Sequence, residues 1–315
     1  MSTCTTASRD LDEPLAGTAA TARTWLLLEQ PGPWGARALT SSHLDPEVGR
    51  ALEAAAEGTG VRVALIRRPG RHADSHPSAR RRVYVAHTAP GNTWLRGHVT
   101  DRPEELLGLD FAALGAGEHG GFGAPHTGDP LALVCTNGKR DRCCAVLGRP
   151  LAAELATSGE QGAWEVTHLG GHRFSPTLLV LPYGYAYGRS DQAAVKEILE
   201  GVRTGRVVTD GCRGSSAWER PGQAAELAVR TETGEDAAGA LSVVHTAGTA
   251  PRWDVTVAHT DGRRWRVTIA QGTSQPARPE SCGAALATPA RMDVVAVRLI
   301  GDGAAQEIPA TVTSE

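Results

Sequence analysis

Short apolar runs separated by turn residues occupy the first third of the chain. They are expected to form strands at residues 25–29, 61–66, 82–87 and 93–99. A helix start signal, Asp45 followed by Pro46, lies between the first two runs, and the helical pattern stops at Gly58. A shorter helical pattern follows the last run. The order strand, helix, strand, strand pair, helix is typical of a thioredoxin-like unit.

The same order of patterns returns in the second third of the chain. The expected strands are residues 131–134, 164–168, 177–181 and 185–187, and the expected helices are residues 145–156 and 192–200. The sequence therefore predicts an α/β fold with two thioredoxin-like units, each of them a mixed sheet flanked by helices.

From Leu241 onward, apolar and polar residues alternate. Segments 253–257 and 265–269 flank an Asp-Gly pair, which is a hairpin signal, and residues 294–300 are expected to form a last strand. The alternation predicts a small C-terminal β module. The predicted division of the chain is an N-terminal tail at 1–21, a first thioredoxin-like unit at 22–126, a second at 127–230 and the β module at 231–315.

Composition and charge narrow the range of functions. The chain has 315 residues, of which 41% are hydrophobic, and its formal net charge of −3 argues against a basic surface for nucleic acid. The N-terminus lacks the apolar core of a secretory signal, and no run approaches the roughly 18 apolar residues of a membrane span. We therefore expect a cytoplasmic protein that binds neither nucleic acid nor a membrane.

The six cysteines are too few for a disulfide scaffold in a chain of this length. Residues 5–134 contain none of them, so the first unit lacks a Cys-x-x-Cys motif and cannot exchange disulfides with thiols of its own. We expect Cys4 to be an exposed thiol in the tail and Cys143 to be a buried structural thiol. Cys212 is expected in a loop, and Cys282 is expected to be an isolated loop or core thiol.

Two cysteines and two histidines are clustered in the second unit. Eight residues separate Cys135 from Cys144, and three separate His168 from His172. Cys135 follows a predicted strand, and Cys144 opens a predicted helix, whose positive N-terminal end lowers the pKa of a thiol. Two adjacent glycines lie between the histidines, which predicts a tight loop that can curl around a ligand rather than a pair on one helical turn.

These residue types leave three interpretations open. The two thiolates and two imidazoles can hold a [2Fe–2S] cluster, with the cysteines on one iron and the histidines on the other, as in Rieske centres. They can instead form a Cys2His2 zinc site, although zinc motifs favour two to four residues between the cysteines. In the third interpretation, Cys135 and Cys144 form a disulfide and the histidines are bystanders.

Two sequence motifs in this region resemble those of a known family. The first reads Cys-x3-Lys-Arg-Asp-Arg-Cys-Cys at residues 135–144, and the second reads His-Leu-Gly-Gly-His-Arg-Phe at residues 168–174, followed by Pro176 and Tyr183-Gly184. In combination they resemble the sucrase/ferredoxin-like family, the bis-histidinyl thioredoxin-like [2Fe–2S] ferredoxins, over roughly residues 4–230.

The resemblance implies a [2Fe–2S] cluster as cofactor, with Cys135, Cys144, His168 and His172 as its metal ligands and residues 127–230 as the ferredoxin domain that carries it. It also implies electron transfer with a redox partner protein, a reductase or an acceptor. The sequence contains no carboxylate pair placed for glycoside hydrolysis and no dinucleotide fingerprint, so we expect an electron carrier rather than a stand-alone enzyme. The alternative is a zinc-stabilised Cys2His2 binding module with no redox role.

Overall fold

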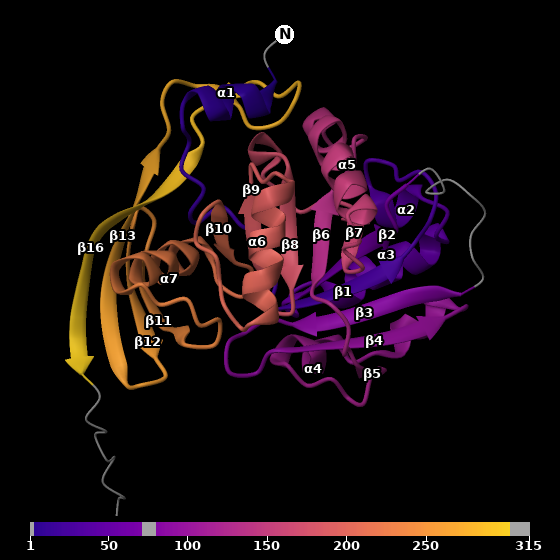
Figure 1. Ribbon diagram of the computed structural model, residues 1–315, viewed down its shortest axis with the longest axis horizontal. Helices are drawn as coiled ribbons and strands as arrows, with labels where there is room; N and C mark the ends of the chain where they lie inside the picture. The colour runs from indigo at the N-terminus through magenta and orange to yellow at the C-terminus, as the bar shows by residue number, and fades with distance from the viewer. Residues whose placement is uncertain (1–2, 71–79, 303–315) are drawn as a thin grey trace, which may run out of the picture.

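The computed structural model describes residues 3–70 and 80–302. A large mixed sheet lies at its centre, helices flank the sheet, and a smaller antiparallel sheet stands at one side (Figure 1). The fold class predicted from the sequence is confirmed.

The first half of the large sheet follows the predicted order. Its elements are β1 (Thr24–Glu29), α2 (Ala38–Ser41), α3 (Pro46–Ala56), β2 (Val61–Arg67), β3 (Arg81–His87), β4 (Trp94–Thr100), the 3-10 helix η2 (Pro103–Gly108), α4 (Phe111–Ala116) and β5 (Ala124–Pro125). The strands β1 and β2 are parallel, whereas β3 is antiparallel to β1 and β4 is antiparallel to β3. Asp45 caps α3 by accepting a hydrogen bond from the Glu47 N–H, as the start signal predicts.

The second half repeats this pairing pattern. Its elements are β6 (Leu131–Cys135), α5 (Arg142–Thr157), β7 (Ala163–Val166), the 3-10 helix η3 (His172–Phe174), β8 (Thr177–Leu181), β9 (Tyr185–Gly188), α6 (Gln192–Arg203), β10 (Cys212–Ser215) and α7 (Arg220–Thr233). The strands β6 and β7 are parallel, β8 is antiparallel to β6, and β9 is antiparallel to β8.

The two halves are joined edge to edge by a short antiparallel pairing of β2 with β7, in which Ile66 lies opposite Val166. The resulting sheet has the strand order β10-β9-β8-β6-β7-β2-β1-β3-β4-β5. Strands of the second half run across those of the first, as Figure 1 shows. Sequence patterns within single strands do not reveal which edges will pair, so the continuous sheet was not predicted.

Successive side chains of a strand point to opposite faces of the sheet, so they pack in different layers of the molecule. In β1, Leu26 and Leu28 pack with α3 and α4, whereas Leu27 points to the other side and lies in one core with Leu133 of β6. In β6, Val134 points outward to α5 and α6. Residues from both halves of the sheet therefore share one inner core, and the helices pack against the outer faces of the two halves. Cys135, two residues after Leu133, lies on the same inner face.

The C-terminal module is an antiparallel sheet with the order β11-β12-β13-β16. Its strands are β11 (Leu241–Thr249), β12 (Arg252–His259), β13 (Arg263–Thr273) and β16 (Ala290–Asp302). Val255 and Val257 of β12, with Val267 of β13, face one side and pack against α7 in a separate hydrophobic core. The predicted alternation is confirmed, because it buries one face of the module.

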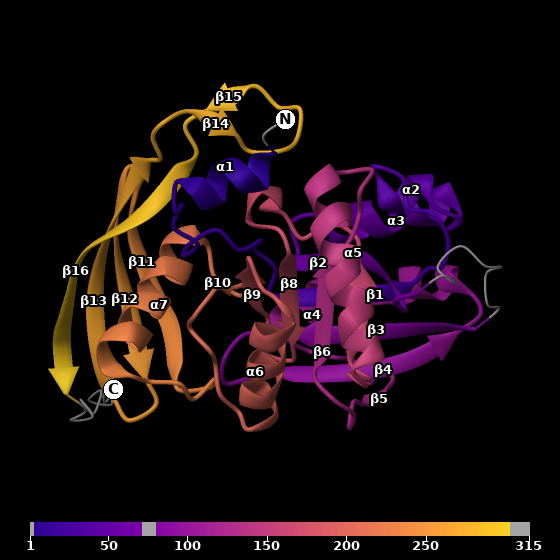
Figure 2. The same ribbon diagram turned by 45° about the horizontal axis from the view of Figure 1, so that its top comes forward.

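A short hairpin of β14 (Arg278–Pro279) and β15 (Leu286–Ala287) extends from this module to α1 (Cys4–Asp10), as Figure 2 shows. The prediction that Cys4 is exposed in a tail is wrong, because Cys4 opens α1 and is 1% exposed. The predicted loop around Cys212 is also wrong. Cys212 begins β10, which pairs with β9 through a register shift that breaks the usual alternation.

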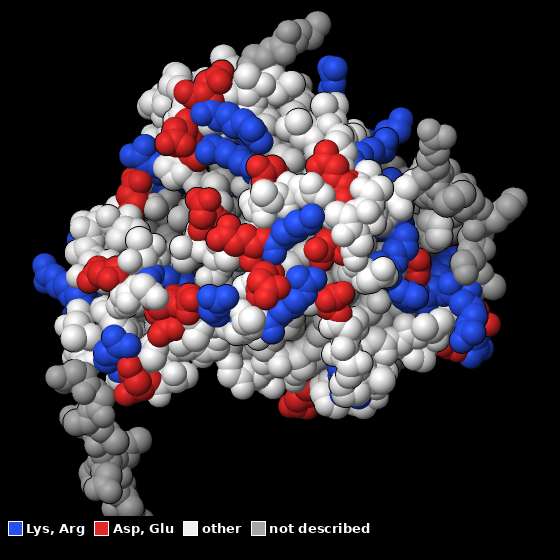
Figure 3. All heavy atoms as spheres, viewed as in Figure 1, with Lys and Arg blue, Asp and Glu red and all other residues white. Residues whose placement is uncertain are grey.

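Charges of both signs are interspersed on the face in Figure 3, in keeping with a net charge near zero. Within residues 3–70 and 80–302, no helix is long and apolar enough to cross a membrane.

Candidate metal centre

The two predicted thiol ligands lie at the join between β6 and α5. Cys135 is the last residue of β6, and Cys144 lies in the first turn of α5, which Asp141 caps by accepting a hydrogen bond from the Cys143 N–H. Both Cys135 and Cys144 are 1% exposed. Because consecutive helical residues point in different directions, Cys143 faces away from this pair.

A glycine brings the helix close to the strand end. A Cβ atom on Gly148 would lie 2.2 Å from the carbonyl oxygen of Cys135, so only glycine permits the observed approach of α5 to β6. The helix therefore packs directly over the backbone that carries the first thiol.

The two histidines lie on the loop that follows β7. Gly170 and Gly171 between them have φ angles of +79° and +70°, a left-handed conformation that favours glycine. The turn stacks the rings of His168 and His172, with centroids 4.5 Å apart and planes inclined by 25°. The prediction of a tight loop is confirmed, and both rings are half-buried.

The thiols and the imidazoles meet at one place. Cys144 Sγ lies 3.2 Å from His172 Nδ1, and Cys135 Sγ lies 2.9 Å from the carbonyl oxygen of Thr167, the residue before His168. The neighbouring Cys144 thiol lowers the pKa of the Cys135 thiol, against the effect of burial, and the nearby His168 ring lowers it further. Cys135 in turn raises the pKa of Cys144, so Cys135 loses its proton first.

Both imidazoles have features of metal ligands. Burial lowers the pKa of His172, and the neighbouring His168 lowers it further, which favours the neutral ring that binds metals. Among the described residues, none forms a hydrogen bond with the buried Nδ1 of His168. A buried polar atom normally has a partner, so this nitrogen is suited to coordinate a ligand. The donor set of two thiols and two imidazoles fits an iron–sulfur cluster or a zinc ion.

The comparison with protein families decides where the chain belongs. The family model described as sucrase/ferredoxin-like matches residues 15–214, which include all four predicted ligands. The chain belongs to the sucrase/ferredoxin-like family. No curated protein and no solved structure matches it. The resemblance of residues 135–144 and 168–174 is therefore confirmed at the level of the family, and the matched stretch ends before α7 and the C-terminal module.

In this family member, two arginines hold the histidine loop by its carbonyl groups. The Arg213 side chain donates a hydrogen bond of 3.1 Å to Gly170 O, and Arg62 donates one of 2.7 Å to His168 O. Arg213 is 1% exposed, and burial lowers its pKa to about 10. Neither arginine was predicted from the sequence, because both lie in strands and neither position has a pattern that connects it to the loop.

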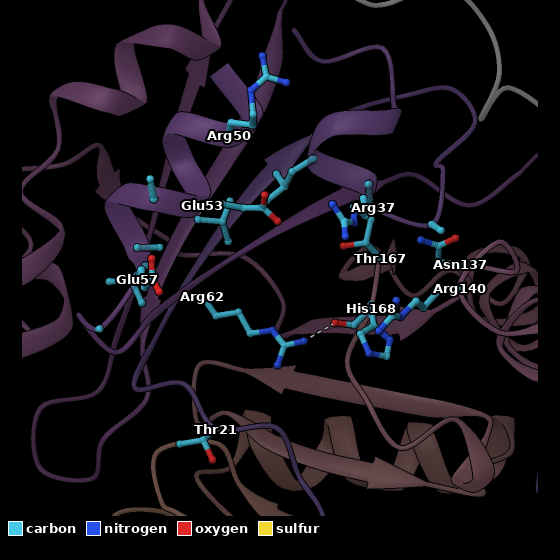
Figure 4. A pocket seen from close by; sticks show the side chains of 18 of the residues that line it. Thr21, Arg37, Arg50, Glu53, Glu57, Arg62, Asn137, Arg140, Thr167 and His168 are labelled. Carbon is cyan, nitrogen blue, oxygen red and sulfur yellow. Dashed lines mark hydrogen bonds between the residues drawn. The ribbon is translucent and has the colours of Figure 1, made fainter. Parts of the chain in front are cut away.

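His168 lines an open groove of about 850 Å³ (Figure 4). The charged residues that line this groove are four arginines and two glutamates: Arg37, Arg50, Arg62, Arg140, Glu53 and Glu57. The site therefore presents a histidine toward solvent while both cysteines remain buried. Figure 4 shows Arg37 and Arg140 near His168, with Arg50 and Glu53 across the groove.

A second group of potential metal ligands lies on the other side of the α5 terminus. Cys4, Asp141, Cys143 and Cys282 each offer an atom within 4.8 Å of the others, and Asp141 forms a similar group with Cys144 and His172. The expectation that Cys282 is isolated is therefore wrong, because a long-range fold contact brings it to Cys143. The prediction that Cys143 is buried is confirmed.

Proposed function

We propose that this chain holds a [2Fe–2S] cluster with Cys135, Cys144, His168 and His172 and serves as a one-electron carrier. The observation that carries the proposal is the meeting of two buried thiols with two stacked imidazoles at the end of β6. Membership in a ferredoxin-like family supports it. The cysteines would bind the inner iron and the histidines the outer one, and a cluster bound in this way accepts and releases one electron.

The surrounding residues favour a reduction potential above that of plant-type ferredoxins, which is about −400 mV. Two neutral imidazoles in place of thiolates remove two negative charges from the ligand set. The buried guanidinium of Arg213 adds a positive charge beside the loop that carries the histidines. Both features stabilise the reduced, more negative state of the centre.

The groove beside His168 is the proposed approach for a redox partner protein. His168 lines it, and exposed Arg37, Arg50 and Arg140 give its rim positive charge. A partner with carboxylates around its own redox centre would match this rim, since opposite charges steer association. The histidine side, rather than the buried cysteine side, is therefore the proposed route for electrons.

One observation favours a second candidate, a zinc-stabilised binding module with no redox role. Cys144 Sγ and His172 Nδ1 are 3.2 Å apart, which suits two ligands of a single ion. In the cluster these two atoms would bind different irons, so the thiol and the ring would have to separate on loading.

Anaerobic purification of the full chain from iron-supplied cells separates the two candidates. The proposal predicts a red-brown protein with about two iron and about two acid-labile sulfide per chain. Cys135→Ser should be colourless, and Cys212→Ser, which alters a buried thiol in β10, should keep its colour. A colourless wild-type protein with zinc that is lost in Cys135→Ser would support the zinc module instead.

A further inference from the structure

Three cysteines from distant parts of the chain meet beside the N-terminus of α5. Cys4 opens α1, Cys143 lies in the first turn of α5, and Cys282 follows β14. Cys143 Sγ lies 3.2 Å from Cys282 Sγ, and Cys4 Sγ lies 3.6 Å from each of the other two sulfurs. The three sulfur atoms thus form a nearly equilateral triangle.

We propose that Cys4, Cys143 and Cys282, with Asp141 as an oxygen donor, form a second metal site that binds one zinc ion. This site uses none of the four ligands proposed for the cluster. It does not depend on the proposed electron transfer.

The spacing of the sulfurs favours a single ion over a second cluster. A tetrahedral zinc ion with Zn–S bonds of about 2.3 Å holds its sulfurs about 3.8 Å apart. The observed separations of 3.2–3.6 Å need to widen by only a few tenths of an ångström. A cluster with one thiolate on each of three irons would need sulfurs much farther apart. A set of three thiolates selects soft or borderline metals such as zinc over magnesium or calcium.

Asp141 supplies the fourth donor and holds two of the thiols in position. Its Oδ1 accepts a hydrogen bond of 2.8 Å from the Cys143 N–H, and its Oδ2 accepts one of 2.8 Å from the Cys282 N–H. The same Oδ2 lies 4.0 Å from Cys4 Sγ. One carboxylate therefore fixes the backbone of two thiol residues and faces the third thiol.

Burial and access also suit a structural metal site. Cys4 and Cys143 are buried, whereas Cys282 is half-buried and leaves one side of the triangle open to solvent.

The ion would tie together three segments that cover the candidate cluster site. Figure 2 shows α1 between the β14–β15 hairpin and the end of α5. The Thr5 hydroxyl donates a hydrogen bond of 3.2 Å to His172 O, and buried Glu13 forms ion pairs with both Arg173 and Arg278. A metal bound by Cys4, Cys143 and Cys282 would fasten α1 and the C-terminal module over the turn that carries His172.

A disulfide between two of these thiols is the alternative explanation for their close contact. The short contact between Cys143 and Cys282 would permit one after a small movement, but a disulfide uses only two of the three sulfurs and leaves Cys4 unpaired. The convergence of three thiols and a carboxylate is better explained by one ion.

Metal analysis of the purified full chain and three variants tests the proposal. We expect about one zinc per chain in the wild type, in addition to any iron. Cys4→Ser and Cys282→Ser should each lose this zinc and keep the iron content and visible spectrum of the wild type. Cys212→Ser, which removes a buried thiol of β10 that is not grouped with these three, should keep the zinc. Circular dichroism checks that every variant is folded.

Titration of the metal-depleted wild-type chain with Co²⁺ supplies a measurement that needs no variant. Intense thiolate-to-cobalt absorption of a tetrahedral site, competed away by one equivalent of zinc, supports the proposal. The proposal is overturned by a wild type that takes up neither zinc nor Co²⁺, by zinc retained in both Cys4→Ser and Cys282→Ser, or by a Cys143–Cys282 disulfide in freshly isolated protein. Zinc that is lost only in Cys135→Ser would mean that the zinc lies at the proposed cluster site. That result would overturn the three-thiol zinc site and would contradict the cluster as well.

Discussion

Cys144 Sγ lies 3.2 Å from His172 Nδ1, although the two residues are 28 positions apart in the sequence. The neighbouring thiol, Cys143, turns to the opposite side of the same helix and meets Cys282. Two adjacent cysteines thus belong to two different groups of potential ligands, and their substitutions should have different effects.

Cys144→Ala should abolish iron and sulfide binding, because it removes a proposed cluster ligand. Cys143→Ala should keep the iron content and the visible spectrum, because its sulfur faces Cys4 and Cys282 instead. Iron and sulfide per folded chain, measured side by side, check the prediction. Loss of iron in Cys143→Ala with retention in Cys144→Ala would reverse the ligand assignment.

Gly171→Ala should destabilise the protein and disturb the histidine loop, because a Cβ there would lie 2.2 Å from Arg213 Nη2. Gly170→Ala is the matched control, since Gly170 has a similar positive φ but no neighbouring atom within 4 Å of a Cβ. The control should lower the free energy of unfolding by about 1–2 kcal/mol, the cost of the left-handed conformation. Gly171→Ala should lower it by more and should also reduce bound iron. Equal effects of the two substitutions in urea unfolding would show that the Arg213 contact is unimportant.

Arg213→Gln should make the reduction potential more negative, because it removes a buried positive charge that lies against the histidine loop. The expected shift is on the order of 60 mV, the equivalent of a tenfold change in a one-electron equilibrium. Arg266→Gln, an exposed change on the C-terminal module, should leave the potential unchanged. Redox titration monitored by visible absorption measures both. A potential that is the same in Arg213→Gln and the wild type would remove Arg213 from the electrostatics of the centre.

Arg50→Glu should slow oxidation of the reduced protein by the anion ferricyanide and speed its oxidation by a cationic cobalt hexammine complex. The reason is that Arg50 lines the groove that reaches His168, so its charge steers reagents to that side. Arg266→Glu changes the net charge equally at a distant position and should have a smaller effect on both rates. Stopped-flow kinetics at low ionic strength compares the variants. Equal rate changes in the two variants would mean that electrons do not pass through the groove.

Local patterns predicted most of the elements, because strand and helix periods depend on nearby residues. The repeated order of elements and the Asp45 start signal were sufficient for the fold class, and the paired glycines indicated the histidine loop. The four candidate ligands were found because all of them lie within one short stretch, from Cys135 to His172.

Long-range contacts could not be read from the sequence. Cys4 and Cys282 are 278 residues apart, and no local pattern shows that α1 and the β14–β15 hairpin meet at α5. The same holds for the β2–β7 pairing and for the contact of Arg213 with Gly170. Cys212 was misplaced because β10 is only four residues long and its register with β9 shifts between Cys212 and Gly214.

Electron paramagnetic resonance of the anaerobically reduced full chain shows directly whether Cys135, Cys144, His168 and His172 hold a [2Fe–2S] cluster. We expect a signal from one reduced [2Fe–2S] cluster per chain with magnetic couplings to two histidine nitrogens, of which one is lost in His168→Cys. A signal without nitrogen couplings would contradict the roles of His168 and His172. A colourless chain that gives no such signal after purification with intact sulfide and iron supply would contradict the cluster itself.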